Sequence, residues 1–179
     1  KIRKNYFKSL ESQIQNKNNA KLYIDKLPLN IIHVGEIIRI FPNAKFIVTL
    51  RHPCDCVLSC FMQDFELNDA MANFLNLNDA AHLYDVVMNL WSQYTSSFSI
   101  NYHEVKYEKL IENFESTIKS ILNFLELSWD DAMLEYLRTA KKRGRIATPS
   151  YYQVTKPIYS YANGRWKRYK KQASSIYPI

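Results

Sequence analysis

The chain has few glycines, few cysteines and no long apolar run, and each shortage excludes a kind of protein. Only three glycines occur in 179 residues, which argues against long flexible loops. Cys54, Cys56 and Cys60 form neither a disulfide framework nor a zinc-ligand pattern, so we interpret them as structural thiols in a reducing compartment. The first residues lack the apolar centre of a signal peptide, and no stretch approaches the roughly 20 apolar residues of a membrane span. We therefore expect a cytoplasmic protein without a membrane span.

What the chain does contain is enough apolar sequence for a core and a strong positive charge. A length of 179 residues predicts a single domain, 1–179, and a hydrophobic content of 47% is typical of a globular protein. The net charge of +7 favours an anionic partner: a phosphorylated small molecule, a nucleic acid or an acidic peptide. Basic and aromatic residues concentrate in the segment 141–179.

The most informative stretch runs from residue 46 to residue 59. Its apolar, partly β-branched start predicts a buried strand at 46–50. Pro53 then suits the first position of a helix, and Asp55 in the first turn complements the helix dipole. Arg51 lies at this junction, where free helix N–H groups and a guanidinium both suit a phosphate. The alternative interpretation is an ordinary surface arginine at the end of a strand.

Short apolar runs alternate with amphipathic stretches along the whole chain. We expect strands at 22–24, 46–50 and 104–107, and helices at 1–15, 31–41, from residue 53, at 80–98, at 113–125 and at 129–139. This alternation predicts an α/β fold, with a largely parallel sheet flanked by helices.

Three of the predicted strands end at residues with suitable chemistry for a nucleotide. Ligands bind at the carboxyl ends of parallel strands, and here those ends carry Lys26, Arg51 and Tyr107. The two cations suit phosphate groups, and the aromatic ring can stack on a base. Each could also be an ordinary residue at a strand end, but three together favour a binding site.

These residues resemble a known family. Arg51 followed eight positions later by Ser59 resembles the 3′-phosphate-binding motif of sulfotransferases that use 3′-phosphoadenosine 5′-phosphosulfate (PAPS). Other matching elements, in chain order, are Asp25-Lys26-Leu27-Pro28, Phe41-Pro42-Asn43-Ala44, Tyr107-Glu108-Lys109-Leu110, Thr148-Pro149-Ser150, Gln153-Val154, Lys156-Pro157 and Gly164-Arg165-Trp166. The resemblance covers about residues 25–169. It extends to tyrosylprotein sulfotransferases and to bacterial sulfotransferases that carry tetratricopeptide repeats, and the bacterial group is the more similar of the two.

The resemblance implies a P-loop-nucleotide-hydrolase-like fold and transfer of a sulfuryl group from PAPS to an acceptor hydroxyl, without a metal. By analogy with phosphoryl transfer, the reaction needs positioning and cations where charge develops. The resemblance implies that Arg51 and Ser59 hold the 3′-phosphate and that Tyr107 contacts the nucleoside. It also implies that Ser150 lies along the cofactor near the transferred group, that Arg165 reaches the phosphates of the cofactor and that Lys26 lies near the bridging oxygen. Lys156 is a weaker candidate, and the segment 141–179 would close over the cofactor.

The sequence departs from the family in two places. Gln63 stands where tyrosylprotein enzymes carry an arginine, which weakens a protein-tyrosine acceptor. The chain also has no strand and loop resembling Pro-Arg-Ser-Gly-Thr-Thr, which wraps the 5′-phosphosulfate, and no catalytic base in the usual place after that loop. We therefore expect the C-terminal part of a sulfotransferase domain, inactive alone. A missing strand would leave an exposed sheet edge, through which a homodimer could form.

Two other functions fit parts of the sequence. A nucleic-acid-binding module would use the basic, aromatic segment 141–179. A kinase-like phosphotransferase of related fold would need a glycine-rich Lys-Ser/Thr loop, which the chain lacks, and a carboxylate for magnesium, which is not evident. Since 141–179 matches the sulfotransferase signature, we expect a nucleotide cofactor and a hydroxyl acceptor as partners, and no nucleic acid.

Overall fold

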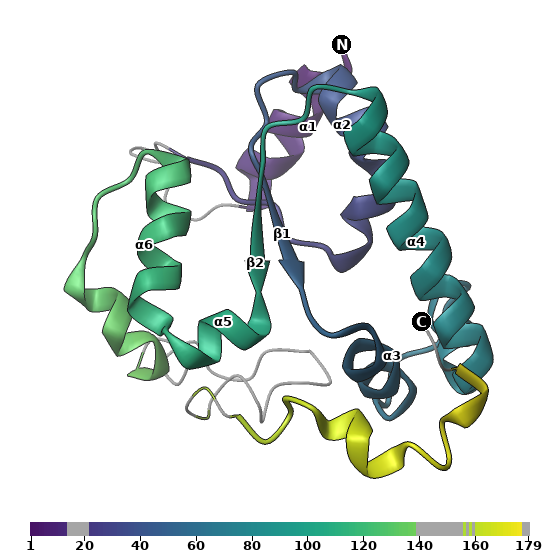
Figure 1. The fold of residues 1–179 in the computed structure, drawn as a ribbon. Coiled ribbons are helices and arrows are strands. Elements are labelled where there is room, and N and C mark those ends of the chain that lie inside the picture. Colours follow the sequence, from purple (N-terminus) through teal and green to yellow (C-terminus); the bar gives the residue numbers. More distant parts are fainter. Residues whose placement is uncertain (14–21, 139–155, 157, 159, 177–179) are drawn as a thin grey trace. The chain divides into compact units, whose positions relative to one another are not determined.

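The structure is a computed structural model, and it describes residues 1–13, 22–138, 156, 158 and 160–176 (Figure 1). The chain divides into two compact units, of which the first comprises 1–46 and 87–101 and the second comprises 47–86 and 102–179. The long helix α4 (Leu77–Ser97) contributes residues to both. The single domain expected from chain length stays a prediction.

The first unit is helical and packs around aromatic rings. It contains α1 (Ile2–Gln13), the 3₁₀ helix η1 (Pro28–His33), α2 (Val34–Ile40) and the second half of α4. The rings of Tyr6, Phe7, Tyr23 and Phe41 meet edge to face, with centroids 5.1 to 5.8 Å apart. Such edge-to-face pairs stabilise a small core beyond the area they bury.

The second unit contains a two-stranded sheet with helices around it. The strands are β1 (Phe46–Leu50), in this unit from residue 47 onward, and β2 (Tyr102–Lys106), and their arrows point the same way in Figure 1. Helices follow each strand: α3 (Pro53–Phe61) and η2 (Met71–Leu75) after β1, and α5 (Tyr107–Glu112), α6 (Phe114–Leu125) and η3 (Asp131–Glu135) after β2. The short helices η4 (Arg165–Tyr169) and η5 (Ser174–Ile176) complete the described part.

The core of the second unit joins its middle to its C-terminal residues. Val57 of α3 and Ala80 of α4 are buried together with Ala173 and Ile176. Val48 of β1 and Val105 of β2 are also buried. The parallel pairing and the helices between the strands confirm the predicted mixed α/β class. Helix η4 packs on α3, the helix that follows β1.

The strand predicted at 22–24 is wrong. These residues form neither strand nor helix, and Leu22, Tyr23 and Ile24 are 44%, 44% and 78% exposed. A strand needs a neighbour to accept its backbone hydrogen bonds, and in the described chain only β1 and β2 pair with each other. The other strands are found close to their predicted positions, although Tyr107 opens α5 and does not end β2.

Candidate functional site

The end of β1 brings Arg51 against the first residue of α5. Pro53 occupies the first turn of α3, as the sequence predicts, so the chain leaves the strand and turns directly into a helix. The guanidinium carbon of Arg51 lies 5.3 Å from the ring centroid of Tyr107. Burial raises the pKa of Tyr107 above its ordinary value, and the nearby Arg51 charge opposes this shift without cancelling it. Tyr107 is therefore a neutral ring beside a cation.

The guanidinium of Arg51 is held on one side and has a free donor on another. Its Nη2 atom donates a hydrogen bond of 2.6 Å to the carbonyl of Ala162. Its Nε atom is buried and has no hydrogen-bond partner among the residues that the structure describes. Buried polar groups of native proteins are nearly always paired, so a buried guanidinium N–H without a partner is suited to an anionic ligand.

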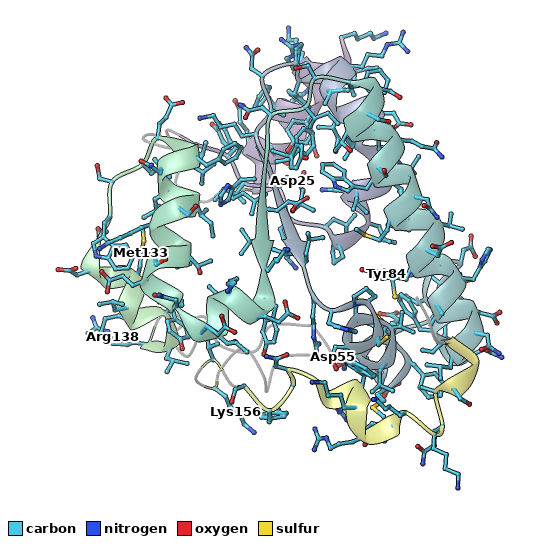
Figure 2. All side chains as sticks on the ribbon, in the orientation of Figure 1. Asp25, Asp55, Tyr84, Met133, Arg138 and Lys156 are labelled. Atoms are coloured by element: carbon cyan, nitrogen blue, oxygen red, sulfur yellow. The ribbon has the colours of Figure 1, made fainter. Side chains whose placement is uncertain are left out.

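Asp55, in the first turn of α3 and labelled in Figure 2, is the most buried charged side chain of the described residues. Only 1% of its surface is exposed. Its Oδ2 accepts the backbone N–H of Gly164 over 2.7 Å, and its Oδ1 accepts that of Trp166 over 2.8 Å. Oδ1 also lies 4.0 Å from Nη2 of Arg51. Asp55 thus does more than complement the helix dipole, and it fastens the segment 164–166 to α3.

This segment contains the Gly-Arg-Trp element of the sequence. Gly164 has a φ of +66°, in the left-handed region that favours glycine, and Arg165 begins η4 immediately after it. Arg165 is half-buried and lies between the two residues whose amides bind Asp55. Ser59 is half-buried on α3 and shares a helix face with Asp55, four positions earlier.

A thiol pair lies on the same helix. Cys56 and Cys60 are hydrogen-bonded to each other and half-buried, and they are not in a disulfide. The pKa of Cys56 is lowered to about 7, first by the hydrogen bond from Cys60 and also by the nearby Arg51 charge, while burial opposes the shift. The same bond raises the pKa of Cys60. Cys54 is fully buried, as expected of a structural thiol, whereas Cys56 has the properties of a reactive one.

The structure brings some of the sequence-predicted site residues together and leaves others apart. Arg51, Tyr107 and the turn with Arg165 lie in one cluster of contacts within the second unit. Lys26 is exposed and belongs to the first unit, so its place beside Arg51 stays a prediction. Lys156 is exposed. Ser150 lies outside the described residues, as do Thr148, Pro149, Gln153, Val154 and the rest of 141–155.

Sequence reasoning missed Asp55 as a site residue. Its signal was a carboxylate inside the apolar run 54–58, where a buried charge needs hydrogen-bond partners.

The sequence also did not predict two grooves of the structure. One is an open groove of about 520 Å³ beside His103, Lys106 and Ser120, and the other lies in the first unit. Neither includes Arg51 or Asp55 in its lining. The candidate site is therefore identified by its paired charges and its unpaired donor.

The described residues contain neither a group of metal ligands nor a membrane-spanning helix. No three histidines, cysteines or carboxylates in that part of the chain are close enough to share a metal ion. No helix within it has the length and apolar content to cross a membrane. Metal-independent chemistry stays a prediction.

Comparison with known proteins identifies the family. The sequence model of the sulfotransferase family matches residues 1–131. The chain belongs to the sulfotransferase family. This confirms the family that the motifs around Arg51 and Ser59 indicated. The motifs at 25–28, 41–44 and 107–110 also fall within the matched range, and those from residue 148 onward lie outside it.

Individual relatives of this sulfotransferase-family chain are distant. An uncharacterised protein of Aquifex aeolicus is 32% identical over 87% of the chain and 20% of its own length. Protein-tyrosine sulfotransferase 2 of Gallus gallus is 26% identical over 82% of the chain and 40% of its length. Protein-tyrosine sulfotransferase 1 of Danio rerio is 24% identical over 88% of the chain and 45% of its length. The chain therefore spans less than half the length of each of these curated relatives.

Proposed function

We propose that this chain supplies the 3′-phosphate half of a PAPS site, in an enzyme that transfers a sulfuryl group to an acceptor hydroxyl. The observation that carries the proposal is the buried Nε donor of Arg51, which has no partner in the described chain. Arg51 and Ser59 would hold the 3′-phosphate, and Tyr107 would contact the nucleoside. The proposed fold is that of P-loop nucleotide hydrolases, of which β1 and β2 would be two adjacent parallel strands.

The donors present fit such a nucleotide chemically. A guanidinium presents a planar fork of N–H groups that matches phosphate oxygens, and a hydroxyl adds a neutral donor. The unpaired Nε of Arg51 supplies an N–H in a site where water has little access. The Tyr107 ring, which Arg51 contacts, would stack on the adenine.

Other residues would act nearer the transferred group. We propose that Lys26 stabilises the charge that develops on the leaving phosphate, and that Ser150 lies along the cofactor near the sulfuryl group. Arg165 would add a second cation to the phosphates, and Lys156 is a weaker candidate for the same task. PAPS supplies the sulfuryl group, and the residues of the chain bind, orient and neutralise charge, without a metal.

We also propose that the chain alone has little or no transferase activity. The sequence contains no loop resembling Pro-Arg-Ser-Gly-Thr-Thr for the 5′-phosphosulfate. The names of two relatives point to tyrosine in proteins as an acceptor, but Gln63 replaces the arginine of that group, so the acceptor hydroxyl is left open. Measured turnover of PAPS with a phenol or a tyrosine peptide would contradict the proposed inactivity.

Calorimetric titration tests nucleotide binding directly. We expect adenosine 3′,5′-bisphosphate to bind about tenfold or more tightly than ADP, which lacks the 3′-phosphate, because a hydrogen bond to a charged group contributes ~1.5–3 kcal/mol. Arg51→Ala should abolish this preference, and Ser59→Ala should reduce it. Ser59→Ala removes only a half-buried hydroxyl, so it keeps the test valid if Arg51→Ala disturbs folding.

The control for this titration is Arg138→Ala. Arg138 is an exposed arginine paired with Glu135 over 3.3 Å, and its replacement removes the same charge from the second unit. It should leave the preference for the 3′-phosphate unchanged. Equal binding of both nucleotides by the unmodified chain would overturn the proposal.

Partners beyond the nucleotide remain predictions. We propose that the chain does not bind nucleic acid as its function. A nucleic-acid module would bind single strands with an affinity that falls steeply with salt and does not depend on a 3′-phosphate. The homodimer through an exposed sheet edge and the cytoplasmic location also stay predictions, and sedimentation at several concentrations would test the first.

A further inference from the structure

We propose that Asp55 is a positioning residue that orders the two cations assigned to the phosphates of the cofactor, Arg51 and Arg165. The inference rests on the proposed function, because it concerns how that site is assembled. Asp55 would not touch the nucleotide. It would act through the backbone on both sides of Arg165 and through the guanidinium of Arg51.

The burial of Asp55 makes its hydrogen bonds important. A carboxylate that is 1% exposed is strongly unfavourable unless donors surround it. Two backbone amides donate to it over 2.7 and 2.8 Å, and Nη2 of Arg51 lies 4.0 Å away as an ion-pair partner. Both amide donors come from far along the sequence, since Gly164 and Trp166 lie 109 and 111 positions beyond Asp55. The contact therefore joins two distant parts of the sequence.

The two amides bound by Asp55 flank Arg165. Fixing the N–H groups of both Gly164 and Trp166 leaves the backbone of Arg165 little freedom. Gly164 contributes by adopting a φ of +66°, which allows its own N–H to face α3 at the start of η4. The carboxylate therefore sets where the Arg165 side chain departs from the backbone.

The same carboxylate borders Arg51. Nη2 of Arg51 lies 4.0 Å from Asp55 and donates to the carbonyl of Ala162, two positions before Gly164. Arg51, Asp55 and residues 162–166 thus form a closed ring of contacts. Within this ring Nη2 donates to the protein, and the buried Nε has no hydrogen-bond partner among the described residues. Loss of Asp55 would release the guanidinium and the turn together.

The test uses Asp55→Asn, which preserves shape. The amide of asparagine must turn its NH₂ toward one of the two backbone donors, so one hydrogen bond is lost and two donors face each other. Hydrogen exchange of the segment 162–168 reports the order of the turn. The ratio of the affinities for adenosine 3′,5′-bisphosphate and ADP reports the site.

A matched control is available in the second unit. Asp130 also accepts a backbone N–H, from Ala132 over 2.8 Å, but it is exposed and caps η3. Asp130→Asn therefore removes one charge and one backbone cap without touching the proposed phosphate ligands. It should change neither the exchange of 162–168 nor the ratio of affinities.

We expect Asp55→Asn to accelerate exchange in 162–168 about tenfold and to lower the preference for the 3′-phosphate by a similar factor. The double variant that combines Asp55→Asn with Arg165→Ala should lower the preference by less than the product of the two single effects, because both substitutions act on one cation. A purely structural aspartate would destabilise the fold and leave the ratio of affinities unchanged.

The outcomes separate this inference from the proposed function. Unchanged exchange in Asp55→Asn would overturn the inference, and so would faster exchange with an unchanged preference. Both results leave 3′-phosphate binding by the wild-type chain intact. A wild-type chain without any preference would instead contradict the proposed function, and the inference would fall with it.

Discussion

His52 stacks on Trp166, with ring centroids 5.0 Å apart and an angle of 21° between the ring planes. The backbone N–H of His52 donates to Oε1 of Glu108 over 2.9 Å, which connects the start of α3 to α5. On Trp166, Lys170 places its ammonium 5.2 Å from the ring centroid. The stack therefore joins α3 to η4 by a second route, next to the hydrogen bonds of Asp55.

Replacing this ring should loosen the C-terminal turn. Trp166→Ala removes the stack and the cation–π contact of a half-buried side chain, so we expect the free energy of unfolding to fall by about 2 kcal/mol. Trp166→Phe keeps an aromatic ring and should lower it by about 1 kcal/mol or less. Urea denaturation followed by circular dichroism measures both.

A second tryptophan provides the control for this effect. Trp129 is also half-buried and lies beneath a lysine, with Nζ of Lys119 5.4 Å from its ring centroid. Trp129→Ala should lower stability without changing the preference for the 3′-phosphate, whereas Trp166→Ala should lower both. Equal preferences in the two variants would show that the His52 stack has no part in the site.

Gly164 should tolerate asparagine better than alanine. Its φ of +66° disfavours a side chain, whereas the three atoms nearest to an added Cβ belong to the flexible Lys167 side chain, at 3.6 to 3.8 Å. Backbone strain then decides the outcome, and we expect Gly164→Ala to lower the free energy of unfolding by about 1 kcal/mol. Gly164→Asn should lower it by less, because asparagine enters the left-handed region more readily. Denaturant midpoints that rank alanine above asparagine would contradict this explanation.

The part of the fold that local sequence determines was predictable. The apolar run ending at Leu50 and the proline at Pro53 specify a strand followed at once by a helix, and β1 and α3 form there. The run 22–24 has a similar apolar character, but a strand also depends on a partner elsewhere in the chain. That partner is absent from the described residues, so the local pattern alone misled the prediction.

The candidate site was predictable only in its separate residues. Arg51, Tyr107 and Arg165 could be named from their chemistry and their order along the chain, and the first two are indeed in contact. The connection through Asp55 could not be named, because its partners lie more than 100 positions away and are backbone amides, which every sequence contains. Ser150 and Lys26 remain predictions from resemblance.

Alkylation of Cys56 should follow the titration of a thiol with a pKa of about 7. Because the thiolate is the nucleophile, its reaction rate with iodoacetamide, followed by mass spectrometry of the α3 peptide, should rise with pH and reach half of its maximum near pH 7. Cys60→Ala removes the hydrogen bond that stabilises the thiolate, so the midpoint should move up toward the ordinary value of about 8.5. Buried Cys54 serves as the internal control and should react slowly throughout. A Cys56 midpoint that stays near 8.5 in the unmodified chain, or one that Cys60→Ala leaves in place, would show that the thiol pair does not control its reactivity.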